Sequence, residues 1–407
     1  MKEQFDFKSE NSKKEELEKN LQSNNVNTQV NDNRNLVFME KLLKLMVAKN
    51  GSDLFITAGY PPAIKINGSI VPVGEQLLSA GQTNELAKSI MNERQWIEFN
   101  KSSECNFAIA PENVGRFRVN AFKQQNRTGL VLRVINTVIP NLDDLRVPEG
   151  LKNIIMSKRG LVIIVGATGS GKSTTLAAMI GHRNQNQSGH IITIEDPIEF
   201  VHNHNKSIIT QREVGVDTES WETALKNTLR QAPDVILIGE VRDRETMEFA
   251  IAFAETGHLC LCTLHANNSN QALDRIINFF PEEKKQQLLL DLSLNLRAVV
   301  SQRLIPSAEY GRLPAVEIML NTPFVSDNIA KGDVANLKEI MKKSREQGMQ
   351  TFDQALFDLY ESNLITFEDA IRNADSANDL RLNIKLHSVR GLPAEGPVVN
   401  HLKMADH

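Results

Sequence analysis

The sequence predicts two folded parts of different class: an α+β domain, and then an α/β domain with a parallel sheet and a helical C-terminal part. The first part holds short strand-like runs separated by turn residues, and an Asn-Gly pair at 67–68 lies between two of them. Such a pair is a strong hairpin signal. The second part holds short, nearly all-apolar runs separated by helical patterns, which is typical of a sheet buried on both faces.

Length and composition narrow the class of protein. The chain has 407 residues, which at roughly 150 residues per domain suggests two or three domains. A net charge of −4 and an aromatic content of 5% disfavour a dedicated nucleic-acid binder, which is usually basic and offers rings for base stacking. No apolar stretch suits a membrane-spanning helix and no secretory signal is visible. Three cysteines are too few for a four-cysteine zinc site, so we expect a reduced, cytoplasmic protein.

The N-terminal part begins with a segment that resembles a disordered leader. Residues 1–35 are rich in charged residues and asparagine, and their apolar content is too low to offset the entropy of ordering. The α+β domain is expected over 36–138. It opens on a helix, because Phe38, Leu42 and Met46 recur at helical spacing.

A strand of this first domain carries arginines in an alternating pattern. Arg118 and Asn120 should share one face of the strand, with Phe117 and Val119 on the other. Arg133 lies in the next apolar run. A guanidinium can bind phosphate through two hydrogen bonds, including as a finger delivered from another domain. Ordinary surface arginines on a half-buried strand explain the pattern equally simply.

The second part is predicted from its alternation of strands and helices. A proline-containing linker is expected at 139–150, the α/β domain at 151–385, and a disordered tail at 386–407. The portion after about residue 281 should be mainly helical, with a capping box starting at Thr351. The apolar strands are predicted at 161–165, 190–194, 235–238 and 259–263.

A phosphate-binding loop follows the first of these strands. Residues 166–173 read GATGSGKS and match G-x4-G-K-[ST]. The glycines let main-chain N–H groups surround phosphate oxygens, and the dipole of the following helix favours the same anion. Lys172 should reach the β- and γ-phosphates, and the Ser173 hydroxyl should bind Mg²⁺. The motif predicts an ATP–Mg²⁺ site held by Gly166, Ala167, Thr168, Gly169, Ser170, Gly171, Lys172, Ser173 and Thr174.

Two further strands end in acidic residues. Glu240 follows the apolar run 235–238, as in a Walker B strand, where a carboxylate can help to hold Mg²⁺. Glu195 and Glu199 follow another strand, and Pro197 should turn the chain at the ligand-binding edge of the sheet. Either glutamate could deprotonate the attacking water, and spacing alone does not choose between them. The plainer interpretation is a solvated acidic loop.

Histidines flank the last predicted strand. His258 precedes it and His265 follows it. A histidine close to a strand end can hydrogen-bond a phosphate and respond to its loss, although a lone histidine is more often a structural donor. His202 and His204 lie in a polar loop, and we expect them to be solvated.

Taken together, these segments resemble the PilT/PilU family of type IV pilus retraction motors, within the secretion ATPase superfamily. The resemblance runs from about Phe38 to Lys385. It implies a PAS-like N-terminal domain, a RecA-like ATPase domain and a cytoplasmic homo-hexameric ring. Besides the phosphate-binding loop it rests on 193–200 (the family's Asp box), 237–243 (Walker B), 255–265 (the His box) and 115–120.

The resemblance also implies a role for each candidate site residue. Glu199 resembles the catalytic Asp-box glutamate, and Glu240 resembles the Walker B acid that helps to bind Mg²⁺. His258 and His265 match the His-box pair, and Arg118 and Arg133 match N-terminal-domain arginines that reach the γ-phosphate.

Finer details of the resemblance favour the PilU branch. Segments 261–268 and 349–360 are more similar to PilU than to PilT, and FVSDNI at 324–329 replaces a motif of PilT proteins. This implies an accessory motor that works beside a PilT-type sister motor and on the inner-membrane pilus platform protein. It would touch the membrane only through the pilus machine, at the cytoplasmic face of the inner membrane. The alternatives are a pilus-assembly or secretion ATPase of the same superfamily, a nucleic-acid motor, and a non-hydrolysing scaffold.

Overall fold

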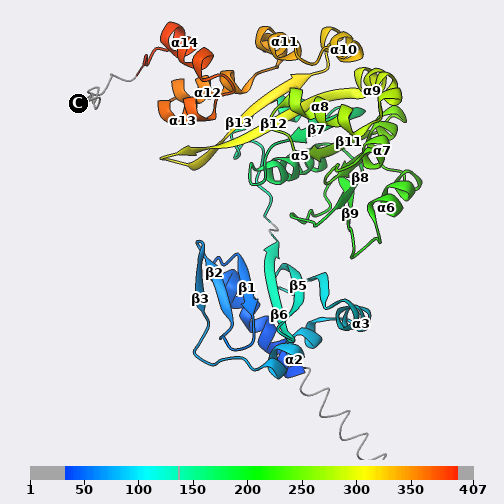
Figure 1. Cartoon of the computed structure of the whole chain (residues 1–407), viewed down its shortest axis with the longest axis vertical. Coiled ribbons are helices and arrows are strands. Elements are labelled where there is room, and N and C mark those ends of the chain that lie inside the picture. Colours follow the sequence, from blue (N-terminus) through cyan, green and yellow to red (C-terminus); the bar gives the residue numbers. More distant parts are fainter. Residues whose placement is uncertain (1–32, 136–137, 393–407) are drawn as a thin grey trace, which may run out of the picture. The chain divides into compact units, whose positions relative to one another are not determined.

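The computed structural model describes residues 33–135 and 138–392, and it divides the chain between residues 137 and 138 into two compact units (Figure 1). The predicted leader up to residue 32 and the predicted tail from 393 lie outside the described residues. The parts of these segments that are described are ordered, contrary to expectation. A helix already covers 33–48, and Tyr360 donates a hydrogen bond of 2.7 Å to the carbonyl of Gly391.

The first unit is an antiparallel sheet with helices on one face. Its strand order is β3-β2-β1-β6-β5-β4. The predicted hairpin is confirmed: Ile66 pairs with Ser69 around Asn67 and Gly68, which both have positive φ. The elements are β1 (Asp53–Ile56), β2 (Ala63–Ile66), β3 (Ser69–Pro72), α2 (Ala80–Ile90), α3 (Glu93–Ser102), β4 (Glu104–Ile109), β5 (Arg116–Gln124) and β6 (Arg127–Ile135).

The second unit contains a seven-stranded sheet in the order β13-β12-β7-β11-β10-β8-β9. Its strands run parallel except for β13, which pairs antiparallel with β12 at the edge. The predicted apolar strands are confirmed as β7, β8, β10 and β11. The strands are β7 (Gly160–Val165), β8 (Gly189–Glu195), β9 (Ser207–Glu213), β10 (Val235–Ile238), β11 (Leu259–Leu264), β12 (Leu296–Ser307) and β13 (Gly311–Leu320).

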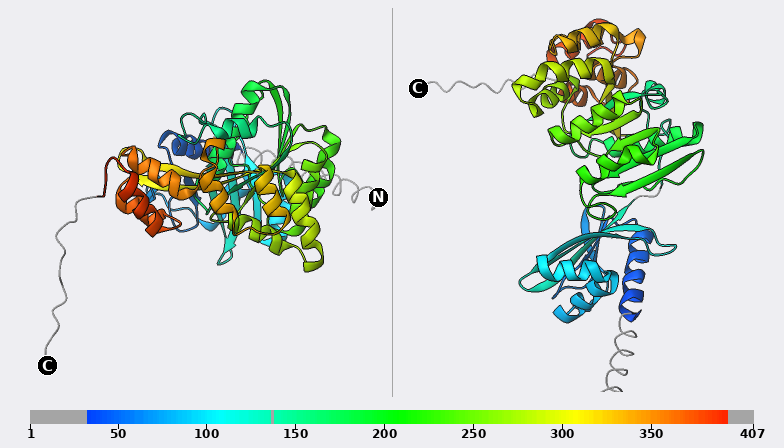
Figure 2. Two further views of the ribbon diagram at one scale, coloured as in Figure 1. Left: turned by 90° about the horizontal axis from the view of Figure 1, so that it is seen from above. Right: turned by 90° about the vertical axis from the view of Figure 1, so that its right-hand side faces the viewer.

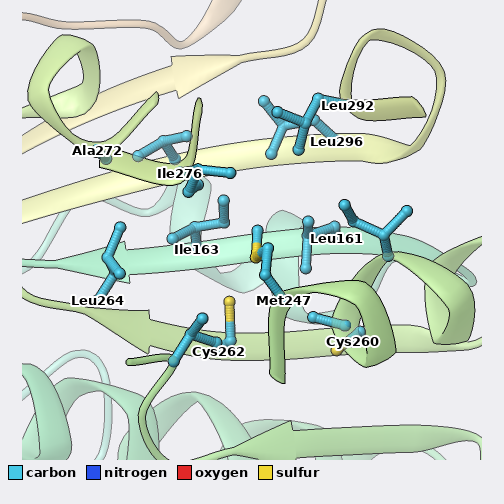
Figure 3. Close-up of a cluster of buried hydrophobic side chains, with 14 of the residues drawn as sticks. Leu161, Ile163, Met247, Cys260, Cys262, Leu264, Ala272, Ile276, Leu292 and Leu296 are labelled. Carbon is cyan, nitrogen blue, oxygen red and sulfur yellow. The ribbon is translucent and has the colours of Figure 1, made fainter. Parts of the chain in front are cut away.

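Helices cover both faces of this sheet (Figure 2). Leu161 and Ile163 pack with α7, α8 and α9 on one face (Figure 3). Val162 and Ile164 pack with α4 and α5 on the other face. Buried, unpaired Cys260 lies in the first of these clusters, as expected. The helices are α4 (Gly150–Ile155), α5 (Lys172–Asn186), α6 (Trp221–Thr228), α7 (Arg244–Glu255), α8 (Ser269–Phe279) and α9 (Glu282–Asn295).

The C-terminal portion is less purely helical than expected. The long hairpin of β12 and β13 occupies 296–320, and helices follow it. The predicted capping box at Thr351 is confirmed at the start of α12. The helices are α10 (Pro323–Ala330), α11 (Leu337–Lys343), α12 (Phe352–Glu361), α13 (Phe367–Asn373) and α14 (Ala377–His387).

Arg303 of β12 fastens these C-terminal helices to the sheet. It donates to the carbonyl of Asn373 at 2.7 Å and forms an ion pair of 2.6 Å with Asp375, and its guanidinium lies over the ring of Phe352. The neighbouring Ser301 donates to buried Glu317 of β13 at 3.2 Å. Arg303 and Ser301, which are two residues apart in β12, therefore contact different elements.

The segment that we expected to be a linker is part of the second unit. The segment at 139–150 packs on the second unit, since Leu142 is buried in the cluster that contains Ile154 and Val162. Within the part of the chain that the structure describes, no helix has both the length and the apolar character needed to cross a bilayer.

Candidate functional site

The parallel sheet brings most of the predicted site residues of the second unit to one edge. Strands β7, β11, β10 and β8 are neighbours and run in the same direction, so the segments that follow them meet at their carboxyl ends. A cavity of about 520 Å³ opens there. Its lining includes Thr168, Gly169, Gly171, Lys172, Ser173, Thr174, Glu195, Glu199, Glu240 and His265.

The phosphate-binding loop leads from β7 into α5. Gly169 and Gly171 have φ values of +79° and +85°, which side chains other than glycine rarely tolerate. Helix α5 begins at Lys172, so its N-terminal N–H groups face the loop. The Lys172 ammonium donates to the carbonyls of Gly166 at 2.7 Å and Ala167 at 2.9 Å. The geometry matches an anion-binding loop with a cation held above it.

Charge is concentrated around Lys172. Burial lowers the pKa of its ammonium, and the carboxylates of Glu240 and Glu199 act in the opposite direction. These carboxylates come from different loops, one after β10 and one after β8. The cavity therefore combines a phosphate-binding cation with two carboxylates, as phosphoryl transfer to water requires.

Glu240 is held by two neighbours. Arg242 donates to its carboxylate at 2.8 Å, and His265 Nε2 lies 3.1 Å from its other oxygen. Arg242 also lies 3.8 Å from Asp196, so it links the Walker B and Asp-box segments. The sequence analysis does not single out Arg242. Its position two residues after Glu240 is the signal that could have identified it.

The two candidate bases have different surroundings. Glu195 accepts hydrogen bonds from Thr193 at 2.6 Å and from Gln211 at 3.3 Å. Burial raises the pKa of its carboxyl to about 7, although both hydrogen bonds oppose the shift. Glu199 lines the same cavity, and its carboxylate raises the pKa of the Lys172 ammonium, against the effect of burial. The geometry thus keeps both glutamates within the site.

The predicted histidine pair is split between the two edges of the sheet. His258 precedes Leu259, which pairs with Gly160 at the start of β7, so it lies at the amino edge. Its Nδ1 lies 3.0 Å from the hydroxyl of Thr256. His265 lines the cavity, whereas His258 is not among its lining residues in the single chain, so the role expected of His258 stays a prediction.

The two histidines of the polar loop after β8 differ in exposure: His204 is exposed, as expected, whereas His202 is partly buried. His202 lines the cavity, and burial lowers the pKa of its imidazole to about 4. It is therefore neutral near pH 7. His204 accepts a hydrogen bond of 3.1 Å from the amide of Ile209.

The arginines of the first unit form a pair of cations on one sheet face. Arg118 of β5 lies directly opposite Arg133 of β6, and the alternate residues Phe117 and Val119 are fully buried, as predicted. Arg133 is 68% exposed and forms an ion pair of 2.7 Å with Asp53. Like charges directly opposite each other destabilise a sheet. The carboxylate of Asp53 lies beside Arg133 and offsets part of this repulsion.

The residues at the cavity suit a magnesium–nucleotide complex. The hydroxyl of Ser173 and the carboxylate of Glu240 both line it, and Mg²⁺ prefers oxygen ligands. Over the described ranges, 33–135 and 138–392, no group of three metal-ligating side chains occurs. Mg²⁺ commonly uses one or two protein ligands together with phosphate oxygens and water, so this sparse set fits it.

Comparisons with known proteins show the family of the chain. The family model described as type II/IV secretion system protein matches residues 35–318. The chain is 63% identical to the type IV pilus ATPase PilU of Pseudomonas aeruginosa over 86% of this chain and 92% of that protein. It is 40% identical to the type IV pilus retraction ATPase PilT of the same organism, over 82% and 97% respectively.

Solved structures show the same likeness. The structure of the pilus retraction motor PilT with bound ADP matches with a TM-score of 0.79 and 38% identity, covering 84% of this chain and 98% of that one. The ATPase DotB of Legionella pneumophila matches with a TM-score of 0.73 and 27% identity, over 82% and 94%.

Proposed function

The chain belongs to the type II/IV secretion system protein family and, within it, to the PilT/PilU type of type IV pilus ATPases, and we propose that it powers pilus retraction as an accessory motor of the PilU kind. The chain is accordingly an ATPase. One observation carries the proposal furthest: Lys172, Glu199 and Glu240 reach one cavity from three loops at the same sheet edge.

The proposed reaction is hydrolysis of ATP at this edge. The loop N–H groups and Lys172 bind the phosphates, and Ser173 and Glu240 would hold Mg²⁺, which neutralises developing charge when bound. Glu199 orients a water and takes its proton as the oxygen attacks the γ-phosphorus. The bond between that phosphorus and the β–γ bridging oxygen breaks, and ADP and phosphate leave.

Glu195 is the alternative base. A pKa of about 7 suits proton transfer at neutral pH, but its carboxylate already accepts two hydrogen bonds. Glu199 remains our choice because it resembles the family's catalytic glutamate and because its carboxylate, unlike that of Glu195, raises the pKa of Lys172. Replacing each in turn by glutamine separates the two.

We assign Arg118 and Arg133 as fingers that meet the γ-phosphate when the two domains close. They lie in the first unit and the phosphate-binding loop lies in the second, so contact requires domain closure in one subunit or between subunits. A homo-hexameric ring, which the resemblance implies, would couple this closure to mechanical work. His265, bonded to Glu240, would respond when the γ-phosphate leaves.

The proposed setting is the base of the pilus. The ring would work beside a PilT-type sister motor and on the inner-membrane platform protein, at the cytoplasmic face of the inner membrane. The test is deletion in a piliated strain, alone and together with the sister motor, with surface pili and twitching scored. Loss of retraction with pili still present supports the proposal. Absence of pili in the single deletion would instead indicate a pilus-assembly ATPase.

A further inference from the structure

We propose that Gln302 of β12 is a positioning residue that holds the phosphate-binding loop in its binding conformation. The inference rests on the proposed function, because it concerns the same nucleotide site. Gln302 belongs to none of the motifs that indicate that site, and it lies far from the loop in the sequence.

Both ends of the Gln302 amide are bonded to the loop region. The side chain is almost fully buried, with 2% exposed. Its Nε2 donates to the carbonyl of Ser170 at 2.9 Å, and its Oε1 accepts from the hydroxyl of Thr175 at 2.8 Å. Ser170 lies in the loop and Thr175 lies in the first turn of α5. One side chain therefore joins β12 to the loop and to the start of the helix.

The loop glycines pack directly against this residue. A Cβ atom built on Gly171 would lie 2.7 Å from Nε2 of Gln302, and one built on Gly166 would lie 2.6 Å from its main-chain oxygen. Side chains at these positions would collide with β12. Gly166 and Gly171 of the loop therefore both pack closely against Gln302.

The bond to Ser170 controls the direction of an N–H group. The carbonyl of Ser170 and the N–H of Gly171 belong to one planar trans peptide and point in opposite directions. Since Gln302 binds this carbonyl, the N–H of Gly171 is turned away from β12. Gly171 lines the cavity. Gln302 therefore preorganises a main-chain donor for phosphate without touching the nucleotide itself.

The first test is Gln302→Met, which keeps the length of the side chain and removes both hydrogen bonds. The carbonyl of Ser170 and the hydroxyl of Thr175 lose their buried partner, and the loop becomes free to rotate. We expect ATP to bind about tenfold to a hundredfold more weakly. KM should rise while kcat changes little, because phosphate contacts are weakened in the ground state and the transition state alike.

The second test is Gln302→Glu, which should show a dependence on pH that Gln302→Met lacks. An ionised carboxylate still accepts from Thr175 but repels the carbonyl of Ser170. A protonated one can donate to that carbonyl, as the amide does, and burial favours the protonated form. ATP affinity relative to wild type should therefore recover as pH falls from about 8.5 to 6.

Matched controls separate this role from general stability. Gln350→Met removes a glutamine that donates to the carbonyl of Val316 at 2.6 Å and does not line the cavity. It should leave ATP affinity unchanged. Thr175→Val, which removes one partner of Gln302, should weaken binding about fivefold. Added to Gln302→Met it should have little further effect, because both act through one contact.

The outcomes distinguish this inference from the function on which it rests. Wild-type ATP affinity in a folded Gln302→Met variant overturns the inference alone. If that variant does not fold, then unchanged affinity in Thr175→Val together with a flat pH response in Gln302→Glu overturns it. If the wild-type protein does not bind ATP, or Lys172→Ala binds it equally well, the proposed function fails and this inference fails with it.

Discussion

The two sheets of the molecule present polar residues in different ways. The antiparallel sheet of the first unit buries one face, so Arg118 alternates along β5 with buried Phe117 and Val119. The parallel sheet of the second unit is covered on both faces by helices. Its central strands β7, β10 and β11 are almost entirely apolar, and the charged groups of the cavity gather where these strands and β8 end.

Because of this difference, we expect the two units to contribute to catalysis in different ways. The strand ends of the second unit build a cavity from several loops of one chain, complete with cation, carboxylates and glycine turns. The first sheet carries Arg118 and Arg133 opposite each other on one face. We therefore expect the second unit to bind nucleotide by itself and the first unit to act only on turnover, and the predictions below test that division.

The largest effect is expected from Lys172→Ala. The change removes the cation of the phosphate-binding loop and charge-assisted hydrogen bonds to phosphate. Both ATP binding and turnover should fall below detection. Isothermal titration with ATP–Mg²⁺ and a phosphate-release assay would check this, and turnover close to that of wild type would refute the nucleotide site.

Arg118→Ala should preserve binding and lose turnover. Finger arginines contribute about 10³–10⁵ in rate, so hydrolysis should drop by about a thousandfold or more while ATP affinity stays within about twofold. A loss of ATP affinity as large as that of Lys172→Ala would show that the first unit also contributes to nucleotide binding, contrary to the expected division between the two units.

Rings that mix two variants test whether Arg118 acts on the phosphate-binding loop of a neighbouring subunit. Arg118→Ala subunits combined with Lys172→Ala subunits should recover partial turnover if a neighbour supplies the arginine. Recovery is measured after co-assembly is verified. Absence of recovery in verified mixed rings would place the finger and the loop in the same subunit.

Glu199→Gln should leave ATP bound and slow its hydrolysis by about 10²–10⁴. Glutamine keeps the shape of the side chain and cannot accept the proton of water. Single-turnover hydrolysis and ATP binding are measured together for this variant and for Glu195→Gln. If only Glu195→Gln is inactive, the base is Glu195.

Replacing the histidines at the two opposite edges of the parallel sheet should have smaller effects on ATP affinity, and these effects should differ between the two residues. His265→Ala removes a partner of Glu240 and should weaken ATP–Mg²⁺ binding about tenfold. His258→Ala should leave the affinity unchanged, because His258 lies at the amino edge. Equal losses in the two variants would contradict the assignment of these edges.

The smallest effect concerns stability and pH. The pKa of Glu195 is raised to about 7 by burial, so the folded protein holds a proton there that the unfolded chain loses near its ordinary value of 4.5. Stability from this group is present at low pH and is lost as pH rises towards 7, by up to about 3 kcal/mol. Glu195→Gln should lack this loss, and urea midpoints at pH 5 and pH 8 would check it. Identical pH dependence in both proteins would argue against a buried, protonated Glu195.

Local patterns in the sequence predicted the parts of the fold and site that depend on neighbouring residues. The phosphate-binding loop is contiguous, the Asn67–Gly68 turn joins adjacent strands, and the alternation around Arg118 has the period of a strand. Each of these signals lies within about ten residues of chain. The strands that end at Glu195 and Glu240 were predictable because they are apolar runs.

The parts that were missed depend on distant contacts. Strand β12 places polar Ser301 and Gln302 at buried positions, which conceals it as a strand, and their partners are remote in the sequence. The segment at 139–150 contains prolines typical of a linker, yet Leu142 packs into a core.

The contacts of β12 have a consequence for how this strand tolerates sequence change. Ser301 and Arg303 point to one side of the sheet and Gln302 to the other, because side chains alternate along a strand. Deleting or inserting one residue ahead of them would exchange the sides. The phosphate-binding loop would lose its amide partner, and Asp375 and Glu317 would each lose one of their partners in the same step. A substitution in β12 damages contacts on one side of the sheet, whereas a change of length damages the nucleotide site and the C-terminal attachment together.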